Sequence, residues 1–160
     1  MRPTDVKALR RHLAKLLDWE DAHLNYASIL AGWPARLRGA RARGAAHTAW
    51  QLLEHLRICQ RDILDFCRDS DYREMSMAAY WPRTPAPPTP AAWSRSLRAF
   101  GRELKAMRRL VASPRTDLFA RIPWGDGQTI LREALLVADH NAYHLGQLLL
   151  LRRLHGAWRP

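Results

Sequence analysis

The longest apolar segment of the chain is the run from Thr129 to Leu154, and it restricts the folds that this sequence can adopt. A helix drawn through this run is apolar nearly all round, so other elements must cover it. Arg132, Asp139 and His140 interrupt the run, which therefore does not fit a membrane-spanning helix. We expect the most buried helix of a helical protein here, with Thr129 as its N-cap and Gly156 just beyond its C-terminal end.

Three further segments repeat apolar residues at intervals of three and four, which predicts helices over about 4–32, 48–68 and 90–112. Thr4 is the expected N-cap of the first of these helices. Thr48 followed by Gln51 matches a capping box for the second, and Thr89 before a proline suits the start of the third. Residues 34–46 carry four arginines among glycines and alanines, and we interpret them as a solvated loop.

The stretch from Trp81 to Pro90 contains five prolines, a density that forbids an α-helix. It predicts a long extended crossover between the second and third helices, which then run in the same direction. The expected architecture is all-α. It consists of one domain over residues 1–160, a four-helix bundle with a long Pro-rich crossover between helices 2 and 3.

The formal net charge of +11 rests on 23 arginines and only three lysines. A solvated basic surface accounts for such a charge, and a nucleic-acid or other polyanion partner is the less favoured alternative. A hydrophobic fraction of 48% argues against disorder. The N-terminus begins directly with a charged amphipathic pattern, so we expect no secretory signal, no membrane association and a cytoplasmic location.

His140 and His144 are four residues apart and therefore lie on one helix face, about one turn from each other. Two imidazoles in this H-x-x-x-H arrangement can ligate one metal ion, although histidines that only hydrogen-bond in the core fit the spacing equally well. Glu133 and Gln147 share the same face. They could hydrogen-bond to the metal ligands or act as an acid or base, and purely structural hydrogen bonds are the alternative. Tyr143 points elsewhere and is expected to be a packing residue.

A third ligand has to come from another segment, and the helical periodicity leaves two candidates open. His55 and His23 both lie at the edge of the apolar stripe of their predicted helices. His12, His47 and His155 fit surface or capping positions.

Two segments together resemble the DinB-like (DinB/YfiT) superfamily of metal-binding four-helix-bundle proteins. They are Thr48-Ala49-Trp50-Gln51-Leu52-Leu53-Glu54-His55-Leu56 and Asp139-His140-Asn141-Ala142-Tyr143-His144-Leu145-Gly146-Gln147. The resemblance implies that His55, His140 and His144 are the metal ligands and that the protein is a homodimer. It is the resemblance, and not the periodicity, that favours His55 over His23.

Three imidazole ligands leave a coordination position open, as in catalytic metal sites. The resemblance therefore implies a divalent metal, zinc or nickel, that activates water or a low-molecular-weight thiol against a small-molecule substrate. The expected function is a metal-dependent hydrolase or thiol transferase. Two alternatives remain: a basic helical protein that binds nucleic acid or another polyanion, and a metal-bound bundle without catalysis.

Overall fold

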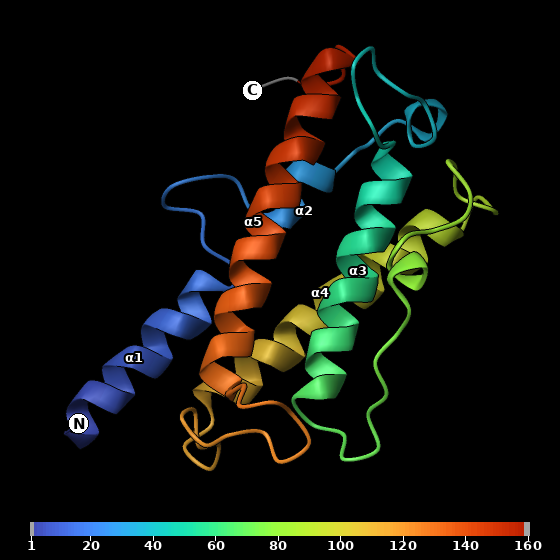
Figure 1. The fold of residues 1–160 in the computed structure, drawn as a ribbon. Coiled ribbons are helices and arrows are strands. Elements are labelled where there is room, and N and C mark those ends of the chain that lie inside the picture. The colour runs from blue at the N-terminus through green and yellow to red at the C-terminus, as the bar shows by residue number, and fades with distance from the viewer. Residues whose placement is uncertain (1, 159–160) are drawn as a thin grey trace.

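The computed structural model describes residues 2–158, and these residues form an all-helical protein without a β-strand (Figure 1). This confirms the expected all-α class. The α-helices are α1 (Pro3–Leu16), α2 (Tyr26–Leu30), α3 (Ala49–Phe66), α4 (Ala92–Ala112) and α5 (Ile130–Leu154), and two short 3₁₀ helices are η1 (Ala35–Leu37) and η2 (Met77–Tyr80). None of the described helices is both long and apolar enough to cross a membrane.

Helix α3 lies at the centre of the packing, with α4 against one side and α5 against another (Figure 1). Helix α1 packs mainly on α4, and the short α2 packs on α5. The core between them is made of fully buried side chains from all three long helices, among them Leu53, Leu56, Phe100, Met107 and Leu148.

The predicted single helix over residues 4–32 is wrong, because the chain leaves the helix after Leu16 and re-enters one only at Tyr26. The side chain of Asn25 accepts a hydrogen bond from the backbone N–H of Ser28 at 3.0 Å and so caps a new helix. Across the break, Arg108 of α4 donates to Asp18 at 3.1 Å and holds the loop. The first N-cap was also misplaced: it is Arg2, with Pro3 at the first helical position.

The ends of α3 and α5 follow the sequence closely. Thr48 and Gln51 form the predicted capping box, and the Thr129 side chain accepts from the backbone N–H of Arg132 at 3.2 Å. Gly156 has a φ of 64°, the left-handed conformation expected just after a helix. The Thr89 cap is wrong, because α4 begins only at Ala92.

Apart from η2, the chain between α3 and α4 has no regular helix, as the prolines require. This segment is anchored beside the start of α3, where the hydroxyl of Thr48 donates to the carbonyl of Pro85. Gly39 makes this approach possible, since a Cβ at that position would lie 2.4 Å from the Cβ of Ala86. The Pro-rich residues are thereby held against the N-terminal half of α3.

Helix α5 is not buried all round, contrary to the prediction. Its neighbours cover only part of its circumference, and one face keeps large apolar side chains in solvent: Leu135, Tyr143, Leu150 and Leu154, with exposed fractions of 46%, 64%, 56% and 57%. Tyr143 is therefore a surface residue, and its assignment as a packing residue is wrong.

Candidate metal centre

Three histidines from two helices meet between α3 and α5. His55 comes from α3, and His140 and His144 come from successive turns of α5. Each offers a ring nitrogen, and these nitrogens all lie within 4.8 Å of one another. His55 and His144 are buried and His140 is half-buried, so the group sits at the edge of the core and could hold a metal ion.

The nitrogen spacing suits a small divalent cation. The Nε2 atoms of His55 and His140 are 3.1 Å apart. Two nitrogens bound to one tetrahedral zinc at the usual bond length are about 3.3 Å apart. Without a cation, the same separation is that of an N–H···N hydrogen bond in which Nε2–H of His140 donates to Nε2 of His55. The spacing therefore fits either a shared metal ion or this hydrogen bond.

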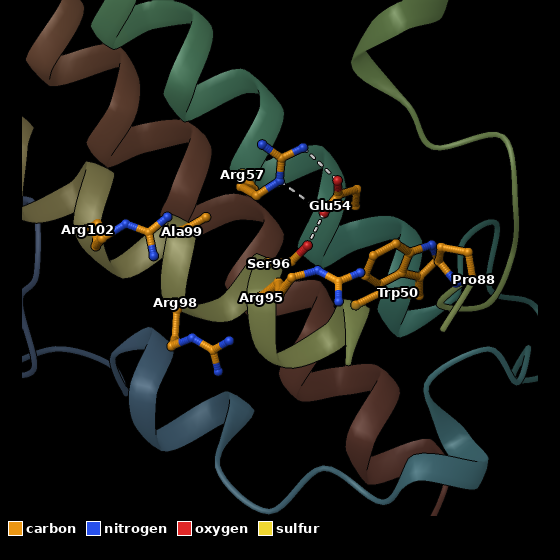
Figure 2. Close-up of a pocket in the computed structure, with 10 residues that line it drawn as sticks. Trp50, Glu54, Arg57, Pro88, Arg95, Ser96, Arg98, Ala99 and Arg102 are labelled. Carbon is orange, nitrogen blue, oxygen red and sulfur yellow. Dashed lines mark hydrogen bonds and ion pairs between the residues drawn. The ribbon is translucent and has the colours of Figure 1, made fainter. Parts of the chain in front are cut away.

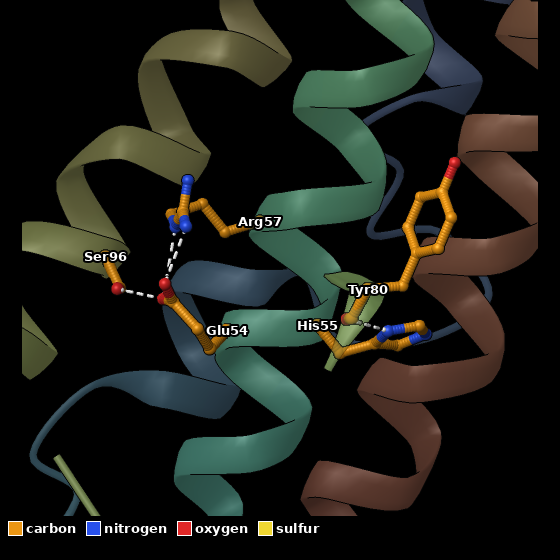
Figure 3. A network of polar contacts seen from close by, with 5 residues as sticks. All are labelled: Glu54, His55, Arg57, Tyr80 and Ser96. Atoms are coloured by element: carbon orange, nitrogen blue, oxygen red, sulfur yellow. Dashed lines mark hydrogen bonds and ion pairs between the residues drawn. The ribbon is translucent and has the colours of Figure 1, made fainter. Parts of the chain in front are cut away.

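Hydrogen bonds orient two of the three rings. The Nδ1–H of His55 donates to the carbonyl oxygen of Tyr80 at 2.8 Å (Figure 3), and the Nδ1–H of His144 donates to Oε1 of Gln147 at 3.0 Å. Because each acceptor is an oxygen that cannot donate, each Nδ1 must carry the proton. The lone pair is then on Nε2 in both rings, the tautomer that outer partners commonly impose on metal-binding histidines.

Burial keeps the imidazoles neutral. It lowers the pKa of His55 and His144 below the ordinary value, and it lowers the pKa of His140 to about 4, with further lowering from the neighbouring His144 and His55. A neutral imidazole is the form that binds a metal. The three rings are therefore ready to bind a cation at neutral pH.

Trp81 packs against the centre. Its ring stacks on that of His55 at a centroid distance of 3.8 Å and an interplanar angle of 4°. The ring of His47 stacks on Trp81 at 4.0 Å. Sequence reasoning gave neither residue a role at the centre, and an aromatic residue beside a proline run was the only available signal.

Cys59 lies one turn along α3 from His55, with its Sγ 3.5 Å from Nδ1 and 3.7 Å from Nε2 of that ring. Burial raises the pKa of its thiol to about 12, with a further rise from nearby Asp62. The thiol therefore stays protonated at neutral pH, and its role here is packing against His55.

Of the other candidate site residues, only one contacts the three histidines in the structure. Gln147 contacts the centre through His144, whereas Glu133 is buried against Arg132, from which it accepts a hydrogen bond at 2.7 Å, and makes no hydrogen bond to the three histidines. His23 is exposed in the loop between α1 and α2. The structure thus brings His55, and not His23, to the α5 pair.

A cavity of about 270 Å³ lies near the centre, although none of the three histidines lines it. His47 and Gln147 form part of its wall, and most of the remaining lining is apolar: Ala45, Ala46, Leu52, Leu150, Leu151 and Leu154. Arg43 is the third polar residue of the wall. His47 and Gln147 are each one contact away from the centre, through Trp81 and His144 respectively. A small molecule in this cavity would contact residues that touch the centre, and not the three histidines themselves.

Comparisons with known proteins give no match: no protein-family model, no curated protein and no solved structure is significantly similar to this chain. The function is therefore inferred from the three histidines, their hydrogen bonds and the nearby cavity.

Proposed function

We propose that this protein is a metal-dependent enzyme of the DinB-like type, in which His55, His140 and His144 bind one zinc or nickel ion. The observation that carries the proposal is the convergence of three ring nitrogens within 4.8 Å. In His55 and His144 the Nδ1–H makes a hydrogen bond, which leaves the lone pair of Nε2 free to bind a metal. In this proposal α1, α3, α4 and α5 are the helices of a four-helix bundle, and the Pro-rich segment is its crossover.

The ligand set favours catalysis over a purely structural role. Three imidazoles leave at least one coordination position open, whereas structural zinc sites usually have four protein ligands. A bound metal would supply Lewis acidity and lower the pKa of a coordinated water or thiol. Gln147 would hold the ring of His144 in position, and Trp81 would cover one face of the His55 ring.

The nearby cavity supports a small-molecule substrate with an apolar body. Leu52, Leu150 and Leu151 would contact that body. Arg43, His47 and Gln147 would offer the polar contacts. The reaction proposed is hydrolysis by activated water or transfer of a low-molecular-weight thiol. The proposal also includes a cytoplasmic homodimer, and the exposed Leu135 and Tyr143 on α5, which lie outside the cavity, are consistent with a second copy.

The test is a paired activity screen. Protein loaded with zinc or nickel is assayed with panels of apolar esters and amides, and with electrophiles in the presence of small thiols. The expected result is turnover that disappears in His144→Ala and persists in His23→Ala. Metal binding without turnover on any panel would instead favour the metal-bound bundle without catalysis.

A further inference from the structure

A second cavity lies on the other side of α3, between α3 and α4. Its volume is about 510 Å³, and four arginines line it together with Trp50 and Glu54 (Figure 2). Arg57 comes from α3, whereas Arg95, Arg98 and Arg102 come from one face of α4, where their spacing of three and four residues places them in a row.

Only one of these four charges is neutralised within the cavity. Arg57 donates to both carboxylate oxygens of Glu54, at 3.1 and 2.6 Å, and the hydroxyl of Ser96 also donates to Glu54. Glu54 is the only carboxylate in the lining, and Glu103 nearby lies outside it. The lining therefore carries a surplus of three positive charges.

The three surplus guanidinium groups have free hydrogen-bonding capacity. Arg95 makes one side-chain hydrogen bond, to the hydroxyl of Thr89 at 3.2 Å. Arg98 and Arg102 make no side-chain hydrogen bond and no ion pair with any residue from 2 to 158.

We propose that this cavity binds the phosphate group of a small phosphorylated molecule. Guanidinium groups match the oxygens of a phosphate with paired, charge-assisted hydrogen bonds, which favour a dianion. The volume is in the range of small-molecule sites. The three arginines are exposed along one face of α4, and the cavity beside them has room for a compact anion. Competition with a nucleic-acid strand separates this proposal from a general basic surface.

This anion site is separate from the metal centre. Glu54 and His55 are consecutive residues of α3, and their side chains leave the helix in opposite directions, toward Ser96 of α4 and toward the backbone of Tyr80 (Figure 3). No histidine lines the arginine cavity. The proposed anion is thus a second ligand, and its binding does not depend on the proposed function of the histidines.

The test is a calorimetric titration of the full chain with inorganic phosphate at low ionic strength. We expect saturable binding, weakened roughly tenfold or more in the double variant Arg98→Gln/Arg102→Gln, because each lost contact is a charge-assisted hydrogen bond. Both side chains are exposed and unpaired, so this variant should keep its fold, which circular dichroism checks. The matched control is Arg109→Gln/Arg115→Gln, which removes the same charge from exposed positions outside the cavity and should leave the affinity nearly unchanged.

Four results would overturn the proposal. One is the absence of saturable binding, and another is an equal loss of affinity in both double variants, which would indicate a general charge effect. The third is loss of phosphate binding in His140→Ala, which would place the phosphate at the metal centre. A single-stranded RNA 20-mer is the last probe: if it displaces phosphate at physiological salt, the site belongs to a nucleic-acid surface and the small-molecule proposal is wrong.

Discussion

Replacing Gln147 with leucine is predicted to weaken metal binding without removing a metal ligand. Oε1 of Gln147 accepts the Nδ1–H of His144 at 3.0 Å and thereby fixes both the tautomer and the angle of that ring. Loss of such an outer partner typically costs about 10–100-fold in metal affinity, or about 1.4–2.7 kcal/mol. Leucine fits the position, because Gln147 is half-buried and borders the same cavity as Leu150 and Leu151.

The assay is competition for zinc against a chromophoric chelator at pH 7.5, together with thermal unfolding with and without metal. For a chain of this size, the lost binding energy corresponds to a metal-dependent rise in Tm that is smaller by about 3–10 °C. Gln147→Glu is the matched control, since a carboxylate keeps the acceptor and should bind zinc at least as tightly as glutamine. Wild-type affinity in Gln147→Leu would refute the role assigned to this hydrogen bond.

Three further predictions concern pH, the α3–α4 contact and the thiol. Because burial holds the histidine pKa values in the folded protein below the unfolded value of about 6.5, the unfolded chain binds more protons in acid. The Tm of metal-free protein should therefore fall as the pH drops from 6.5 toward the pKa of about 4 of His140, and a Tm that stays flat until pH 4.5 would contradict this. Glu54→Ala should lower the free energy of unfolding, measured in urea, by roughly 3 kcal/mol, because Arg57 and Ser96 lose their partner. Glu54→Gln should lower it by less, and an equal loss in both variants would argue against a charged pair. Cys59, whose pKa is raised to about 12, should react with a thiol reagent only after unfolding, and rapid labelling of the native protein at pH 7.5 would show that the thiol is accessible.

Much of the helical framework could be predicted from local sequence. The capping box of Thr48 and Gln51, the cap at Thr129 and the glycine after α5 are short-range signals that depend on neighbouring residues alone. The break between α1 and α2 was missed because the apolar spacing continues through residues 17–25. What decides that break is a long-range contact, from Arg108 to Asp18, together with the capping side chain of Asn25.

In the candidate site, too, local features could be predicted from the sequence and long-range contacts could not. The pairing of His140 with His144 follows from helix geometry, since both belong to one helix. The choice between His55 and His23 could not be made from periodicity, because it depends on which face of one helix packs against another. Trp81 could not be placed either: it reaches His55 only because the Pro-rich segment is anchored against the start of α3.

The central claim is that three histidines bind one metal ion, and metal analysis by mass spectrometry on purified protein tests it most directly. The variants to compare are His55→Ala, which removes a proposed ligand, and His23→Ala, which removes an exposed histidine of the α1–α2 loop. We predict roughly one zinc or nickel ion per chain in the wild type and in His23→Ala, and almost none in His55→Ala. A wild-type protein that remains metal-free after incubation with zinc and nickel, or a His55→Ala variant that retains a full equivalent, would contradict the account.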